Sequence, residues 1–227
     1  MRKVGIIQPG RLGDIIICLP IARWFFERGY EVIWPIQSSY LSNFIEYVDY
    51  ARFIPIGDLD CSEARKICLP QCNTLLDLSI TMLQSHPLND NFFHQNQHKL
   101  SFDAMKYLFA NVPFEEKWNL KFNRNPEREE KLLKNLAIPD GQFTLVHMQG
   151  SSESFAYKGA VCETLVVVDQ LTASIFDWCG VIERAGKIVA IDSSFANLVE
   201  QFGYDGPKYL VRRTADIRPF YRNWNVL

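Results

Sequence analysis

Short apolar runs alternate with amphipathic stretches along the whole chain. β-Branched runs that end at a turn signal are typical of buried strands, whereas apolar residues three or four positions apart indicate a helix. Strands are predicted at 3–8, 31–35, 51–56, 74–80, 143–148, 165–169, 187–191 and 208–212. Helices are predicted at 14–28, 40–48, 62–68, 101–110, 127–136, 173–185 and 194–202. Strands that alternate with helices indicate an α/β protein with parallel sheets and right-handed crossovers.

The pattern falls into two series, which predicts two domains. Residues 113–126 are mixed in character and bounded by prolines, as expected of an interdomain linker. The expected fold is therefore α/β, with two small doubly wound Rossmann-like domains, 1–115 and 116–227, that face a cleft. Residues 82–98 show little periodicity and are predicted to form a long loop. Open α/β sheets bind ligands beyond the carboxyl ends of their strands, so the residues that follow the strands are the candidates for chemistry.

A turn with two glycines follows the first predicted strand. Its sequence is Gly10-Arg11-Leu12-Gly13-Asp14. Glycines let the backbone turn tightly and approach a ligand, and the N-terminus of the following helix offers free N–H groups to an anion. Asp14 is predicted either to cap that helix or to act as a carboxylate at the strand edge. The turn lacks the dinucleotide fingerprint and the P-loop lysine, which disfavours a Rossmann oxidoreductase.

The second half contains a similar turn after its first predicted strand. The strand ends near His147 and runs into Gly150, Ser151 and Ser152, and Lys158 follows. Backbone N–H groups, hydroxyls and a lysine can hold a diphosphate, but the same residues also make an ordinary polar turn. His147 alone is more often a half-buried histidine than a catalyst.

A third turn, Asp192-Ser193-Ser194, opens the last predicted crossover helix, which contains Asn197. Its hydroxyls either cap the helix or bind phosphate oxygens. The three turns, in this order, resemble the motifs of glycosyltransferase family 9, the heptosyltransferase-like group with the GT-B fold. The matching positions are Gly10, Gly13, Asp14, Pro20, His147, Gly150, Ser151, Lys158, Asp192 and Ser193. Ser194 and Asn197 stand where the family has glycine and histidine.

The resemblance implies a shortened glycosyltransferase that moves a sugar from a nucleotide-diphosphate donor to an acceptor hydroxyl. The mechanism would be metal-independent and inverting, with no cofactor beyond the nucleotide sugar. Asp14 would be the general base, and Gly10, Arg11 and Gly13 would form the phosphate or acceptor turn of the acceptor-side domain. Lys158 and the N–H groups around Ser193 would stabilise the leaving diphosphate. The donor-binding residues would be His147, Gly150, Ser151, Ser152, Lys158, Asp169, Asp192, Ser193, Ser194 and Asn197.

The acceptor stays open between a saccharide and a modified DNA base, as used by some bacteriophage DNA glycosyltransferases. The C-terminal tail interleaves basic and aromatic residues, which is typical of nucleic-acid binding but also of a tail that packs back across the domains. These residues are Arg212, Arg213, Arg218, Phe220, Tyr221, Arg222 and Trp224. With 24 basic against 26 acidic residues, the net charge of −2 argues against a nucleic-acid coat protein.

A non-catalytic nucleotide-binding module is a further alternative. The third turn lacks the family's glycine and histidine, and only 45 positions separate His147 from Asp192, room for about one strand and helix.

Composition excludes several other classes of protein. A hydrophobic content of 48% suffices for a core and excludes a disordered chain. No uncharged apolar stretch reaches 18 residues, so we expect neither a membrane span nor a signal peptide.

The six cysteines are expected to be reduced thiols in a cytoplasmic protein. The cluster Cys61, Cys68 and Cys72 lacks the close cysteine pair of a zinc site. His94 and His98 would share a helix face, but their segment is predicted to be a loop. We therefore expect no metal site.

Overall fold

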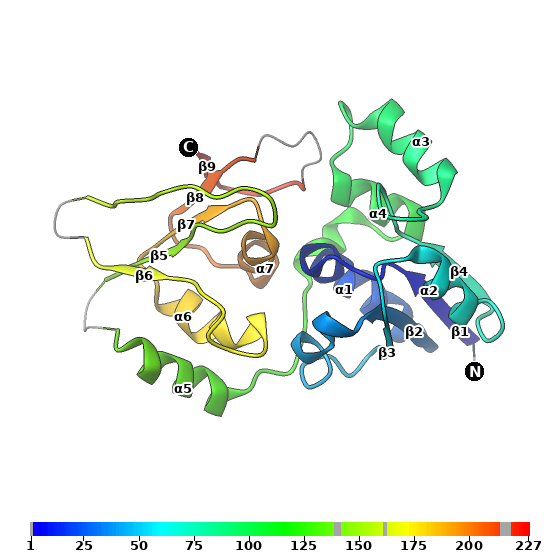
Figure 1. Ribbon diagram of the computed structural model, residues 1–227, viewed down its shortest axis with the longest axis horizontal. Helices are drawn as coiled ribbons and strands as arrows, with labels where there is room; N and C mark the ends of the chain where they lie inside the picture. The colour runs from blue at the N-terminus through cyan, green and yellow to red at the C-terminus, as the bar shows by residue number, and fades with distance from the viewer. Residues whose placement is uncertain (1, 139–141, 161–162, 214–218) are drawn as a thin grey trace. The chain divides into compact units, whose positions relative to one another are not determined.

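The chain divides into two compact units in the computed structural model, which describes residues 2–138, 142–160, 163–213 and 219–227 (Figure 1). The division falls between Asn123 and Arg124. Phe220 groups with the first unit, and Tyr221–Leu227 with the second. The sequence placed the boundary earlier, after residue 115. The 3-10 helix η2 (Phe114–Trp118), which spans that point, packs against the first helix of the chain and so belongs to the first unit.

The first unit is built on a four-stranded parallel sheet with strand order β3–β2–β1–β4. Its strands are β1 (Arg2–Ile7), β2 (Tyr30–Gln37), β3 (Arg52–Ile56) and β4 (Thr74–Asp77). Its helices are α1 (Leu12–Phe26), α2 (Cys61–Cys68), α3 (Pro87–Asn96) and α4 (Phe102–Ala110), with a 3-10 helix η1 at Ser38–Asn43. This strand order matches the first four positions of the Rossmann order 3-2-1-4-5-6.

Both faces of strand β1 are buried, as expected for a parallel sheet. Ile7 lies in a cluster of buried apolar residues with the inner face of α2. A Cβ added to Gly5 would lie 2.7 Å from Cys68 Cβ, so glycine at this position lets α2 approach the sheet. Val4 and Ile6 alternate with these residues and are also fully buried.

The second unit is built on a five-stranded parallel sheet with strand order β6–β5–β7–β8–β9. Its strands are β5 (Thr144–His147), β6 (Leu165–Val167), β7 (Lys187–Ile191), β8 (Lys208–Val211) and β9 (Asn225–Val226). Its helices are α5 (Pro126–Leu136), α6 (Cys179–Arg184) and α7 (Ser194–Phe202), with a 3-10 helix η3 at Ile175–Trp178. Numbered within the unit, the order is 2-1-3-4-5, as in flavodoxin-like sheets. One strand and one helical segment lie between β5 and β7, as the short spacing predicted.

All eight predicted strands are present, but two predicted helices and one predicted loop differ in the structure. The predicted helix at 40–48 is only the short 3-10 helix η1. The predicted loop at 82–98 contains α3, which begins with Pro87 and is capped by the Nδ1 atom of His86 rather than by a typical capping residue. Phe93 buries this helix against α4, a contact that the local sequence does not show. The helix predicted at 173–185 is divided into η3 and α6.

The described part of the C-terminal tail is engaged within the protein. The Phe220 N–H donates to the buried carboxylate of Asp103. The Trp224 indole and the Arg222 N–H both donate to the buried Glu200, at 2.8 Å. These contacts favour the packed interpretation of the tail over a nucleic-acid surface; Arg218 lies outside the described residues.

Within the described residues, no helix has both the length and the apolarity that a bilayer crossing needs. The described cysteines, Cys18, Cys61, Cys68, Cys72 and Cys179, are free thiols. Cys162 lies outside the described part of the chain.

Candidate functional site

Each sheet has one point where the chain reverses its winding direction. In the first unit, β2 and β4 lie on opposite sides of β1; in the second unit, β6 and β7 lie on opposite sides of β5. Ligands of open α/β sheets bind beyond the carboxyl ends of the strands at such switch points. The three predicted turns follow β1, β5 and β7, so the structure places each of them at a switch point.

The turn after β1 depends on glycine at position 10. A Cβ there would lie 2.3 Å from Leu59 Cδ2 and 2.9 Å from Tyr40 Cε2, so the backbone passes directly against two side chains. Arg11 is exposed and forms the N-cap of α1, which makes Asp14 the third helical residue. The alternative in which Asp14 is the N-cap is therefore wrong. Its Oδ2 atom instead accepts a long hydrogen bond, 3.4 Å, from the Arg11 N–H.

A buried lysine lies beside this carboxylate. Lys106 on α4 has no exposed side-chain surface, and its Nζ atom is 3.6 Å from Asp14 Oδ1. The same ammonium donates to Gln8 Oε1 at 2.5 Å and to the Leu78 carbonyl at 2.7 Å. The Asp14 side chain remains 17% exposed. One side of the carboxylate is thus held by the protein, and a ligand proton can reach the other.

The turn after β5 meets the turn after β7 through a histidine and a serine. His147 Nδ1 lies 3.0 Å from Ser193 Oγ, and the same Oγ accepts from the Ala196 N–H as the N-cap of α7. The Ser193 hydroxyl thus joins the two turns while it also caps α7. Burial lowers the pKa of His147 to about 4, so the ring is neutral at pH 7. The ring also lies 5.2 Å from that of Phe195.

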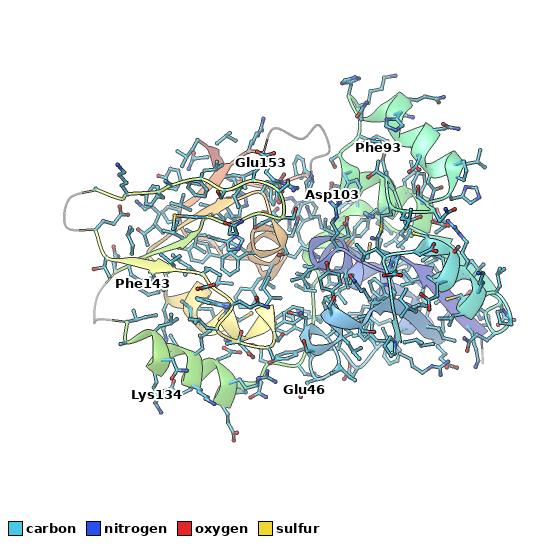
Figure 2. The ribbon with its side chains drawn as sticks, in the orientation of Figure 1. Glu46, Phe93, Asp103, Lys134, Phe143 and Glu153 are labelled. Carbon is cyan, nitrogen blue, oxygen red and sulfur yellow. The ribbon has the colours of Figure 1, made fainter. Side chains whose placement is uncertain are left out.

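The turn after His147 is a tight hairpin that an arginine touches. Gln149 bridges Ser154, and the Gly150 N–H donates to the carbonyl of Glu153, which is labelled in Figure 2. Arg213, two residues beyond β8, donates to Ser151 Oγ at 3.3 Å. These contacts bring the carboxyl ends of β5, β7 and β8 together.

Known proteins resemble this chain in fold but not in sequence. No protein-family model matches the sequence, and neither does any curated protein. A family 9 glycosyltransferase from Veillonella parvula aligns over 100% of this chain and 86% of its own, at TM-score 0.62 and 12% identity. TibC, an iron-containing dodecameric glycosyltransferase from enterotoxigenic E. coli, aligns over 98% of this chain and 62% of its own, with a TM-score of 0.58 and 8% identity. E. coli heptosyltransferase WaaC with ADP aligns over 100% of this chain and 90% of its own, with a TM-score of 0.52 and 12% identity. The chain has the fold of the family 9 glycosyltransferases.

This GT-B fold confirms the α/β architecture and, at the level of fold, the resemblance based on the three turns. Three predicted donor-binding residues make no described contact with His147 or Asp192. Ser152, Lys158 and Asp169 are exposed, and in the part of the chain described here no hydrogen bond or ion pair joins them to His147 or Asp192. Their roles stay predictions.

Two predicted donor-binding residues make hydrogen bonds within α7 and its N-cap. Ser193 caps it, and the Asn197 side-chain N–H donates to the Ser193 carbonyl at 3.0 Å. Asn197 is buried, at 4% exposed, and its amide is neutral. Ser194 is the first residue of α7, where the backbone N–H groups are not used by the helix itself.

Two neighbours of the predicted site residues were not predicted from the sequence: Lys106, which faces Asp14, and Arg213, which contacts Ser151. Lys106 is a lone cation on an apolar helix beside Met105 and Tyr107, which was the available signal. Arg213 was assigned to the tail. Among the described residues, no group of three or more His, Cys, Asp and Glu side chains is placed to hold a metal ion.

Protonation of His147 should destabilise the protein at mildly acidic pH. The unfolded chain takes up this proton below about pH 6.5, and the folded chain only below about pH 4. Between these values the unfolded state binds more protons, so the free energy of unfolding falls as the pH falls, by about 3 kcal/mol in total. Urea unfolding of the wild type and of His147→Gln from pH 6.5 to 4.5 measures this difference. His94→Gln, at an exposed histidine, should keep the wild-type pH dependence; equal slopes for all three proteins would contradict the assignment.

Proposed function

We propose that this chain transfers a sugar from a nucleoside diphosphate donor to an acceptor hydroxyl, without a metal and with inversion. The acceptor O–H gives its proton to the Asp14 carboxylate, and the freed oxygen attacks the anomeric carbon. The bond from that carbon to the phosphate oxygen breaks, and the nucleoside diphosphate leaves with the electron pair. A base is needed because a sugar hydroxyl is a poor nucleophile while it keeps its proton.

The observation that carries this proposal is the partly exposed carboxylate of Asp14 at the switch point of a glycosyltransferase fold. The Lys106 ammonium and the Arg11 N–H both face this carboxylate. These contacts fix its orientation while leaving oxygen lone pairs for an acceptor proton.

The second unit offers the groups that a leaving diphosphate needs. The first N–H groups of α7 begin at its switch point, and Ser151 and Arg213 lie at the adjoining strand ends. Helix N-termini and arginines stabilise phosphate charge. WaaC, which shares the fold, was solved with ADP, so adenosine diphosphate is the first nucleotide to test.

We propose a saccharide rather than a DNA base as the acceptor. The tail that motivated the DNA alternative uses the Trp224 indole and the Phe220 backbone for contacts inside the protein. A chain that binds nucleotides but transfers nothing would be the non-catalytic module. Its distinguishing result is nucleotide affinity without turnover.

A thermal-shift screen of nucleoside diphosphates and their sugars tests the donor site. A ligand at 100 times its Kd should stabilise the folded protein by about 2.7 kcal/mol, which is readily measured. We expect one nucleotide to shift the melting temperature clearly, and sugar release or transfer to follow when its sugar conjugate is supplied. An unchanged melting temperature with every nucleotide would contradict the donor-site proposal.

A pair of glycine substitutions locates the binding. A Cβ at Gly150 would lie 3.0 Å from the Glu153 carbonyl and 3.6 Å from Arg213 Cδ, whereas a Cβ at Gly57 meets nothing within 4 Å. We therefore expect Gly150→Ala to weaken nucleotide binding and Gly57→Ala to leave it unchanged. Unchanged binding in both would place the nucleotide elsewhere.

A further inference from the structure

Arg213 has hydrogen-bonding capacity that the described residues do not use. Its side chain is 18% exposed, and its Nη1 donates to Ser151 Oγ at 3.3 Å. Its Nη2 is 3.8 Å from Asp192 Oδ2, beyond hydrogen-bond distance. Its Nε is buried, and none of the described residues accepts a hydrogen bond from it. A guanidinium has five N–H donors, and a buried donor without a partner is costly.

A structural arginine in the same chain shows the difference. Arg65 binds Asp77 Oδ2 with both Nε and Nη2, at 2.9 and 2.6 Å. That close geometry is typical of an arginine whose charge is fully matched. Asp192, by contrast, is only loosely paired with Arg213, and its Oδ1 accepts the Tyr221 hydroxyl at 2.7 Å.

The position of Arg213 points to a ligand of the second unit. Its side chain lies against the Gly150 turn, where a Cβ on the glycine would be 3.6 Å from Arg213 Cδ. Asp192 immediately precedes Ser193, the N-cap of α7, so the guanidinium lies near the carboxyl ends of β5, β7 and β8. A cation held near a glycine turn and an open helix N-terminus is a combination suited to phosphate oxygens.

We propose that Arg213 binds the diphosphate of the donor and stabilises its charge as the sugar leaves. This inference rests on the proposed function and gives one residue of its donor site a specific role. Asp192 loosely positions the guanidinium and leaves its Nε and remaining N–H donors for phosphate oxygens. Asn197, which stands where the resembling family has histidine, carries no charge, so Arg213 provides a cation from the next strand end.

Calorimetric titration tests this role with three probes: inorganic pyrophosphate, the four common nucleoside diphosphates, and their nucleosides. We expect Arg213→Gln to weaken pyrophosphate and diphosphate binding by about 10- to 100-fold and to leave nucleoside affinity unchanged. Arg213→Lys keeps the charge but loses the planar fork, so we expect a smaller loss. Arg212→Gln is the matched control, because the neighbouring side chain is exposed; it should bind as the wild type does.

The outcomes separate this inference from the proposed function. If the wild type binds a nucleoside diphosphate and both Arg213 variants bind it equally well, the inference is overturned and the function stands. An equal loss for nucleosides and diphosphates assigns Arg213 a structural role and also overturns it. If the wild type binds pyrophosphate through Arg213 but no nucleotide, Arg213 is still a diphosphate-binding residue, but the proposed function and the role of Arg213 in it are overturned. Binding of neither probe overturns both. If Arg213→Gln does not fold, Arg213→Lys against the wild type gives the same decision.

Discussion

Asp14→Asn should lower kcat for sugar transfer by about a hundred- to ten-thousand-fold, the range that general base catalysis supplies. The Kd for the donor's nucleoside diphosphate should stay unchanged, because the proposed donor groups all belong to the second unit. Asparagine keeps the shape of the side chain but cannot take the acceptor's proton. A loss in kcat without a loss of donor affinity indicates an interaction made in the transition state. Steady-state kinetics and calorimetry measure the two quantities.

A matched substitution controls for the change of charge. Asp205 is exposed and precedes β8, so it lies at the amino edge of its sheet, away from the switch point. Asp205→Asn should keep the wild-type kcat. Because Asp14 is an ion-pair partner of the buried Lys106, the Asp14 variant is also expected to lose some stability, and kcat should be compared where both proteins are folded. Wild-type turnover in Asp14→Asn would remove this residue from the mechanism.

The strands and the switch points could be predicted from the sequence because their signals are local. Both faces of a parallel strand are buried, so each strand is a short apolar run, as in 187–191. A turn that follows such a run lies at the carboxyl edge whatever the rest of the fold does. This logic correctly predicted that the turns leading to Asp14, His147 and Ser193 are associated with the carboxyl ends of strands.

The partners of these residues could not be predicted in the same way, because they come from distant positions. Lys106 meets Asp14 from 92 positions away, and Arg213 meets Ser151 from 62 positions away. Neither pair has a local pattern. The predicted N-cap of α1 was wrong for a different reason. Arg11 is not a typical capping residue, so the residue preferences of the N-cap position favoured Asp14. Tertiary contacts also decided α3, which Phe93 anchors against α4.

A fully buried ion pair in the first unit should contribute strongly to the stability of the protein. Asp103 on α4 and Lys117 on η2 have no exposed side-chain surface, and Lys117 Nζ lies 2.5 Å from Asp103 Oδ2. Asp103 also accepts from the Phe220 N–H, and Lys117 donates to the Phe220 carbonyl. The pair therefore holds the start of the described tail to α4 and η2.

Lys117→Met should lower the free energy of unfolding by about 3–5 kcal/mol, because it leaves the Asp103 carboxylate buried without its cation. Urea unfolding followed by circular dichroism measures the change. Lys134→Met is the matched control. Lys134 pairs with Glu130 on the surface of α5, where its side chain is 74% exposed and extends from the helix, as Figure 2 shows. Such an exposed pair contributes about 0.3–0.5 kcal/mol, so the control should differ little from the wild type.

A double variant tests whether the cost of Lys117→Met comes from the buried carboxylate that is left without a cation. Asp103→Asn combined with Lys117→Met removes both charges and leaves a neutral amide that still accepts from the Phe220 N–H. If the cost of Lys117→Met comes from the unpaired carboxylate, the double variant should be more stable than Lys117→Met alone. Additive losses would instead show that each side chain acts independently, through its own contacts with the tail. A cost below about 1 kcal/mol for Lys117→Met would show that the carboxylate finds another partner or reaches water.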